Sequence, residues 1–142
     1  MVFSNSTEYA IRAVTHRALL PSGTLAGARE ISQAENIPMP FLWKILQKLG
    51  RRKLVRSFKG LRGGYELARP ADQITLQDLV AATTGDELAG RCVLGLSQCD
   101  ENHPCPMHSQ WKEIRAQLLT MLEQTTVAVL AGATINRKGE AQ

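Results

Sequence analysis

The 142-residue sequence predicts a mainly α-helical protein with a small β-hairpin wing: a winged helix-turn-helix followed by a long C-terminal dimerisation helix. Three observations predict this fold. Two helical patterns joined by a short turn precede a hairpin pattern that contains several glycines. The basic residues gather around these segments. Near the C-terminus, apolar residues recur at helical spacing over a length that a small domain cannot cover.

The first helical pattern begins at Asn5, which we expect to form a capping box with Glu8, and it ends at Pro21. Residues 28–35 form a short second helix. After a turn over residues 36–40, a third helix begins with a proline, and its apolar stripe leaves a basic outer face. A helix, a tight turn and a second helix with such a face are typical of the helix-turn-helix motif.

Two short strands are predicted next, over residues 54–60 and 65–69, because glycines in the link permit the tight turn of a hairpin. Thr75 is expected to cap a fourth helix that packs back on the domain. Residues 1–83 are therefore expected to form one winged domain. Residues 84–107 are rich in glycine, proline and polar residues and contain all three cysteines, which is typical of a functional loop.

The last helix is predicted from about Pro106 to about Ala131, a length of roughly 39 Å. We expect residues 108–131 to dimerise with a second copy of the chain, and residues 132–142 to form a flexible tail. The alternative is a helix that folds back on its own domain. The expected interface consists of Trp111, Ile114, Leu118, Met121, Leu122, Thr125 and Val129.

Charge is unevenly distributed along the chain. Residues 1–70 contain twelve Lys or Arg and four Glu, a net charge of +8, whereas the rest of the chain carries −4. Eight basic residues and no acidic residue lie from Lys44 to Arg62. Such a block predicts a polyanionic partner, and the alternative is a solvated basic face.

The composition argues against several classes of protein. Apolar residues make up 44% of the chain, as in ordinary globular proteins, and no apolar run approaches the ~18 residues of a membrane span. No secretory signal is visible, so we expect a cytoplasmic protein without a disulfide framework and without a membrane partner. No nucleophile–base pair, phosphate loop or paired carboxylate stands out, and we expect neither an enzyme nor a small-molecule substrate.

The cysteines follow the spacing Cys92-x6-Cys99-x5-Cys105-x2-His108. Three thiolates and an imidazole in a polar loop can converge on one metal, and the alternative is three unconnected cysteines. Such a set can hold structural zinc, although zinc pairs are usually more closely spaced. Iron–sulfur clusters also accept cysteine ligands together with histidine.

Five segments resemble the Rrf2 family of bacterial winged-helix regulators, whose members include IscR, NsrR and RirA. In order along residues 5–131 they are TEYAIRA, FLWKILQKLGRRKLVRS, KGLRGGYELARP, ITLQDLVAATTG and CVLGLSQCDENHPCPMHSQW. The resemblance implies a homodimer that binds double-stranded promoter DNA. It also implies an iron–sulfur cluster, held by three loop cysteines, whose occupancy alters DNA binding.

Carried onto this chain, the resemblance makes Cys92, Cys99 and Cys105 ligands of the cluster, with His108 as the fourth ligand. The alternative fourth ligand is Glu8, supplied by the first helix of the second subunit. The choice between a [2Fe-2S] and a [4Fe-4S] cluster stays open.

We therefore predict a DNA-binding transcriptional regulator, expected to be a repressor, in which the cluster senses iron, cluster supply, nitric oxide or redox state. The alternative is a zinc-stabilised winged-helix DNA-binding protein with no sensing role. The residues expected to lie against DNA, in the third helix and the wing, are Met39, Pro40, Phe41, Trp43, Lys44, Gln47, Lys48, Arg51, Arg52, Arg56, Lys59, Arg62, Gly63 and Gly64.

Overall fold

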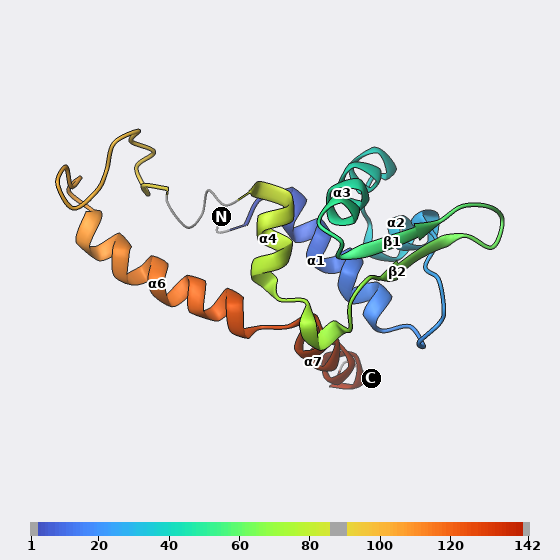
Figure 1. Ribbon diagram of the computed structural model, residues 1–142. Helices are drawn as coiled ribbons and strands as arrows, with labels where there is room; N and C mark the ends of the chain where they lie inside the picture. Colours follow the sequence, from blue (N-terminus) through green and yellow to red (C-terminus); the bar gives the residue numbers. More distant parts are fainter. Residues whose placement is uncertain (1–2, 86–90, 141–142) are drawn as a thin grey trace.

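The computed structural model describes residues 3–85 and 91–140, with side chains up to residue 135 (Figure 1). Strands β1 (Val55–Phe58) and β2 (Gly64–Leu67) form an antiparallel hairpin in which Val55 pairs with Leu67 and Phe58 pairs with Gly64. The predicted winged helix-turn-helix is confirmed. The elements in chain order are α1 (Asn5–Ala18), α2 (Ala28–Glu35), α3 (Met39–Arg51), β1 (Val55–Phe58), β2 (Gly64–Leu67), the 3-10 helix η1 (Ala71–Gln73), α4 (Leu76–Thr84), α6 (His108–Gln124) and α7 (Val127–Glu140).

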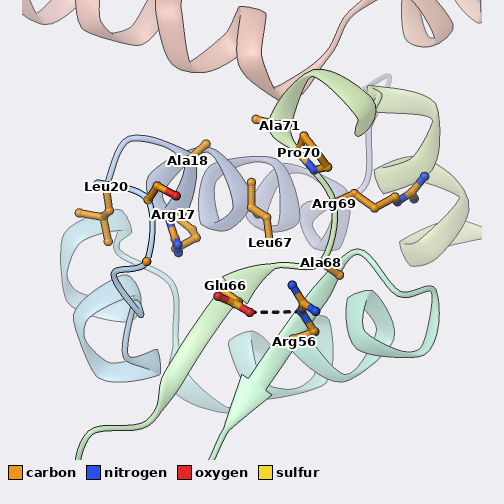
Figure 2. A pocket seen from close by; sticks show the side chains of 12 residues that line it. Arg17, Ala18, Leu20, Arg56, Glu66, Leu67, Ala68, Arg69, Pro70 and Ala71 are labelled. Carbon is orange, nitrogen blue, oxygen red and sulfur yellow. Dashed lines mark ion pairs between the residues drawn. The ribbon is translucent and has the colours of Figure 1, made fainter.

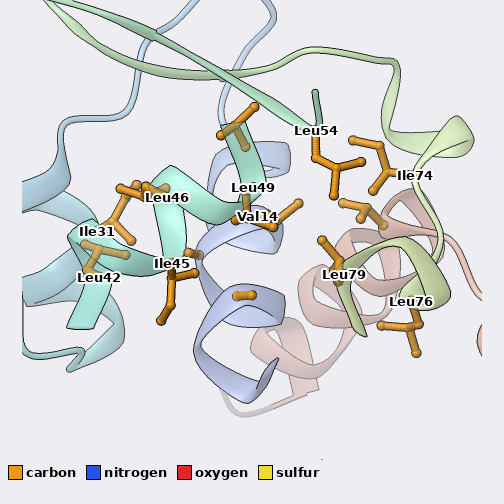
Figure 3. Close-up of a cluster of buried hydrophobic side chains, with 14 of the residues drawn as sticks. Val14, Ile31, Leu42, Ile45, Leu46, Leu49, Leu54, Ile74, Leu76 and Leu79 are labelled. Carbon is orange, nitrogen blue, oxygen red and sulfur yellow. The ribbon is translucent and has the colours of Figure 1, made fainter. Parts of the chain in front are cut away.

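The hydrophobic core lies where α1, α3 and α4 meet (Figure 3). Helix α1 contributes Val14, α3 contributes Leu49, α4 contributes Leu79, and the loops contribute Leu54 and Ile74, all at most 2% exposed. Burial of each such side chain stabilises the fold by about 1.5–3 kcal/mol. This shared core fixes α3 in position and leaves its opposite face open.

The helix caps differ in part from the sequence prediction. Ser4, not Asn5, caps α1, because the Ser4 hydroxyl accepts a hydrogen bond from the backbone N–H of Thr7 at 3.2 Å. The predicted capping box between Asn5 and Glu8 is therefore wrong. The predicted cap on α4 is confirmed, since Thr75 and Asp78 form a reciprocal capping box.

The predicted single C-terminal helix is wrong, because Thr125 and Thr126 interrupt it. The backbone N–H of Leu76 donates to Thr125 O at 2.9 Å, and that of Val127 donates to Ile74 O at 2.8 Å, which forms a short antiparallel bridge. Two consecutive β-branched threonines favour the extended backbone that this bridge requires. The first part of the predicted helix, α6, starts at His108 rather than Pro106.

After the interruption, the chain folds back against the winged domain. Val127 is fully buried, and α7 packs against α1 (Figure 1). Residues 132–142, for which a flexible tail is predicted, are helical as far as Glu140. The last two residues of that prediction lie outside the described part of the chain. Helix α6 projects from the winged domain and carries the cysteine loop at its far end.

Candidate functional site

Helix α3 has one buried and one exposed face. Its apolar stripe consists of Leu42, Ile45, Leu46 and Leu49, each at most 4% exposed. Two large aromatic residues, Phe41 and Trp43, are each 54% exposed on the other side. Of the α3 residues expected to contact DNA, two are partly buried (Met39 and Lys48) and the rest are exposed: Pro40, Phe41, Trp43, Lys44, Gln47 and Arg51.

The two exposed aromatic side chains have different surroundings. The ring of Phe41 lies 6.4 Å, between centroids, from the ring of Tyr9 on α1, and the two rings are tilted by 55°. The guanidinium of Arg12 in turn lies 5.1 Å from the centroid of the Tyr9 ring. Trp43 has no aromatic partner among the described residues. Phe41 is thus partly a packing residue, whereas the ring of Trp43 is open to an external partner.

Three of the basic residues predicted to lie against DNA contact their own chain. The ammonium of Lys48 donates to Thr83 O at 3.5 Å, and the guanidinium of Arg52 donates to Ala81 O at 3.4 Å. These carbonyls belong to the last turn of α4, which has no basic residue of its own, so the two cations complement its dipole. Arg56 forms an ion pair with Glu66 at 3.2 Å across the hairpin.

The remaining basic residues of the predicted set point to solvent. Lys44 and Arg51 on α3, and Lys59 and Arg62 on the wing, are exposed. Within the part of the chain that the structure describes, none of the four has an ion pair or a side-chain hydrogen bond. Their side chains are therefore available to an external anion.

The two predicted glycines of the wing shape the hairpin. A Cβ atom on Gly63 would lie 2.1 Å from Phe58 O, and one on Gly64 would lie 2.8 Å from Ala26 O. Gly64 also has a φ of 151°, and the next residue of its strand, Tyr65, pairs through its backbone with Ala26. Because a side chain would not fit at either position, these glycines allow the backbones to approach closely. The orientation of the wing depends on that close approach.

Several further residues at this surface were not predicted. Lys53, inside the basic block, is exposed in the turn after α3 with a φ of 59°. Leu61 is fully exposed at the wing tip. A groove between α3 and the wing is lined partly by Ser57, Phe58 and Tyr65. The sequence could have identified Lys53, because it lies within the basic block. It could not have identified the groove, which arises from tertiary packing.

The three cysteines converge as predicted. Their sulfur atoms all lie within 4.8 Å of one another, and the sulfurs of Cys92 and Cys105 are 3.7 Å apart. This separation is far longer than the ~2.05 Å of a disulfide bond, and all three thiols are free. Among the described residues, this is the one group of three His, Cys, Asp or Glu side chains whose geometry could hold a metal ion.

His108 adjoins this group from the first turn of α6. Its Nδ1 lies 3.3 Å from the sulfur of Cys99, and its Nε2 lies 3.4 Å from a carboxylate oxygen of Glu101. A carboxylate on the far nitrogen of a histidine is the usual arrangement around a metal-binding imidazole, because it orients the ring. Trp111 also holds the loop, since its indole N–H donates to Arg91 O at 2.9 Å.

The thiols differ in acidity. Backbone N–H groups of Leu96 and Leu94 stabilise the thiolate of Cys92 against desolvation and lower its pKa to about 7. The pKa of Cys99 is raised: the backbone N–H of Cys105 acts to lower it, but desolvation and the neighbouring thiols of Cys105 and Cys92 outweigh that hydrogen bond. Lys112 and His108 lower the pKa of Glu101 by hydrogen bonding to its carboxylate.

This donor set fits a metal centre. Three soft thiolates with one imidazole suit zinc or an iron–sulfur cluster, and the three sulfurs lie close enough to share one centre. In the same chain, Glu8 belongs to α1 and is not a member of the group. Its ligation from a second subunit therefore stays a prediction.

The residues of the predicted dimer interface do not share one surface. Ile114 and Met121 are exposed on α6, and Trp111 and Leu118 are partly buried there. The assignment of Leu122 is wrong for this structure, because that side chain is fully buried in the core of its own chain. Two others leave the α6 stripe because the helix is interrupted: Thr125 is the C-cap of α6, with an extended backbone, and Val129 lies on α7.

Comparison with known proteins places these features in one family. A model of the Rrf2 family, described as an iron-dependent transcriptional regulator, matches residues 3–133. The chain belongs to the Rrf2 family. A relative from Mycobacterium tuberculosis, named as a regulator of the HTH type, is 37% identical over 95% of this chain and 84% of its own. IscR of Sodalis glossinidius is 28% identical over 92% of this chain and 78% of its own.

The fold is that of known Rrf2 structures. CymR of B. subtilis, described as the global cysteine regulator of that organism, superposes with a TM-score of 0.78 at 23% identity, over 92% of this chain and 96% of its own. As an Rrf2 protein, this chain is a DNA-binding transcriptional regulator and not an enzyme. No helix in the described part of this Rrf2 chain has the length and apolar character to cross a membrane.

Proposed function

We propose that this Rrf2 protein is a homodimeric repressor whose affinity for promoter DNA is controlled by an iron–sulfur cluster held by Cys92, Cys99, Cys105 and His108. The observation that carries the proposal is the convergence of three free thiols within 4.8 Å, with the imidazole 3.3 Å from one of them. When bound, the cluster would supply the sensing chemistry, because it is assembled, lost or oxidised as iron supply, nitric oxide and redox state change. Relatives named IscR and NsrR support this choice.

The DNA contacts in this proposal come from α3 and the wing. Trp43 and Gln47 lie on the exposed face of α3, where they would reach base edges in the major groove. Lys44 and Arg51 would neutralise phosphates beside them, and Arg62 at the wing tip would reach the backbone or the minor groove. This assignment differs from the sequence prediction, because Lys48 and Arg52 instead hold α3 to α4.

The dimer contacts in this proposal come from α6. Ile114 and Met121 are 56% and 47% exposed on a helix that projects from the winged domain (Figure 1). Pairing of this helix with a second copy of the chain would remove its exposed apolar stripe from water. Pairing would place two α3 helices about one turn of DNA apart, or roughly 34 Å, as an inverted-repeat site requires.

A series of hydrogen bonds within one subunit connects the cysteine site to α3. Trp111 ties the loop to α6, and α6 reaches the start of α4 through the hydrogen bond between Leu76 and Thr125. The other end of α4 is held to α3 by Lys48 and Arg52. A change in how the loop sits on α6 would therefore shift the two helices that orient the DNA-binding face.

Zinc is the second candidate, because three thiolates and one histidine also make a tetrahedral zinc site. In that case the metal would stabilise the loop without sensing. CymR of B. subtilis shares this fold and is described as a cysteine regulator, so the fold does not by itself identify the signal that is sensed.

Metal and sulfide analysis of protein purified without oxygen decides between the two candidates. The proposal predicts a brown protein with visible absorption that contains iron and acid-labile sulfide, and a colourless preparation of the Cys92→Ala variant. A colourless wild-type protein with one zinc per chain would overturn the cluster and support the structural zinc site.

A further inference from the structure

A surface pocket of about 450 Å³ lies between the C-terminal end of α1 and strand β2 (Figure 2). This volume is within the range of ~300–1,000 Å³ that is usual for small-molecule sites. No residue of α3 and none of the cysteine loop lines it. The pocket is therefore separate from the exposed face of α3 and from the candidate metal site.

The unusual residue in this pocket is Arg17. It is only 8% exposed, and its Nε atom is buried without a hydrogen-bond partner. Within the described ranges, no acidic side chain or carbonyl oxygen pairs with its guanidinium. Buried charges in proteins are normally paired, because an unpaired one loses its hydration without compensation. The C-terminal end of α1 favours a positive charge there but does not supply the missing acceptor.

The other charged groups around the pocket are already paired. Glu66 is the only acid among the lining residues, and it accepts from Arg56 at 3.2 Å. The guanidinium of Arg69 lies 3.8 Å from Asp78 and points away from the pocket in Figure 2. Arg17 is thus the one lining cation without an acid.

The uncharged part of the lining is apolar. It includes Leu20, Leu67 and Pro70, which surround the pocket in Figure 2. Inorganic anions gain nothing from such walls, whereas an aliphatic group does. A planar guanidinium also matches a carboxylate, which it can bind through two parallel hydrogen bonds.

We propose that this pocket binds a small organic carboxylate, whose oxygens pair with Arg17 and whose aliphatic part contacts Leu20, Leu67 and Pro70. The ligand would supply the acceptor that the buried guanidinium lacks. This proposal does not rest on the iron–sulfur cluster or on DNA binding, and it can fail or succeed independently of both.

The test is an NMR titration of the full-length protein with sodium propionate at constant ionic strength, with inorganic phosphate as the second probe. The expected result is saturable binding in the range of about 1–10 mM, with amide shifts at Arg17, Leu20 and Leu67. Arg17→Met should weaken binding at least about tenfold. The control variant Arg29→Met, which removes an exposed charge on α2 outside the pocket, should bind as the wild type does.

A second variant keeps the proposal testable if Arg17→Met fails to fold. Glu66→Gln removes the negative charge of the lining and should tighten propionate binding several-fold. Absence of saturable shifts, or unchanged affinity in every pocket variant, would overturn the proposal. Binding of phosphate but not propionate would overturn the assignment to an organic carboxylate.

Discussion

The ammonium of Lys48 on α3 lies 3.5 Å from the carbonyl oxygen of Thr83 in the last turn of α4. Arg52 makes the parallel contact with Ala81 at 3.4 Å. Both residues belong to the basic block that suggests phosphate binding, yet both hold one helix of the winged domain against another. Since α4 ends at Thr84, eight residues before Cys92, these contacts join the DNA-binding helix to the element that leads into the cysteine loop.

This division of roles can be measured from the salt dependence of DNA binding. Arg51→Ala should weaken binding to all sequences similarly and lower the slope of log K against log salt by about 0.9, because one phosphate contact is lost. Lys48→Ala should change that slope by much less and reduce the free energy of unfolding by about 0.5 kcal/mol.

Arg115→Ala, which removes an equal charge from α6, is the control for net charge. Equal slopes for the Lys48 and Arg51 variants would show that both side chains contact phosphate and that the contact with Thr83 is broken on DNA.

Trp43 should determine sequence preference rather than general affinity. We expect Trp43→Ala to cost about 1–3 kcal/mol on a duplex selected from a random library and little on scrambled DNA, because base contacts carry the discrimination. Phe41→Ala should instead lower thermal stability, since Phe41 packs against Tyr9. An equal loss of affinity on both duplexes for Trp43→Ala would assign that ring to packing.

The dimer interface is best tested at the exposed residues of α6. Met121→Asp should yield monomers without unfolding the chain, because it places an unpaired charge in the interface. Leu118→Asp should also dissociate the dimer but reduce stability, since Leu118 packs partly against its own core. Analytical ultracentrifugation distinguishes these states.

Ala116→Asp is the matched control, because Ala116 is exposed on the opposite side of α6 from Ile114 and Met121. A Met121→Asp protein that still sediments as a dimer would place the interface elsewhere.

The pKa values predict ordered alkylation of the metal-free protein. Cys92 has a pKa of about 7, so its reaction with iodoacetamide should reach half its maximal rate near pH 7. Cys99, whose pKa is raised, should require a more alkaline pH than an ordinary thiol. Mass spectrometry after alkylation at a series of pH values measures this, and the urea-unfolded chain is the control. Identical profiles for the two cysteines in the folded protein would contradict a lowered pKa for Cys92 and a raised one for Cys99.

The fourth ligand can be assigned from visible spectra. His108→Ala should leave a labile centre with an altered spectrum, because three thiolates retain most of the affinity for a soft metal. Glu8→Ala should leave the spectrum unchanged, and its effect on stability should be small because Glu8 does not cap α1 through its side chain. A changed spectrum for Glu8→Ala, with a normal one for His108→Ala, would make Glu8 of the second subunit the ligand.

The parts of the fold that depend on local pattern could be predicted. The stripe of Leu42, Ile45 and Leu49, the cap at Thr75 and the glycine-rich wing each follow from neighbouring residues. The spacing of the cysteines was likewise sufficient to predict that their sulfurs meet.

The predictions that were wrong concern features that depend on contacts between distant segments of the chain. Apolar spacing continues through Thr125, but the backbone there pairs with Leu76, which lies far earlier in the chain, and the helix is interrupted. The roles of Lys48 and Arg52 depend in the same way on where α4 ends. The unpaired state of Arg17 became visible only with the pocket around it.

The most direct test of the account is the affinity of the same protein preparation for its promoter DNA with and without the cluster. We predict a change in Kd of about 5–150-fold, the usual range for coupling between two sites, and a smaller change in the Lys48→Ala variant. Equal affinity of the cluster-loaded and cluster-free wild-type protein would contradict control of DNA binding by the cysteine site.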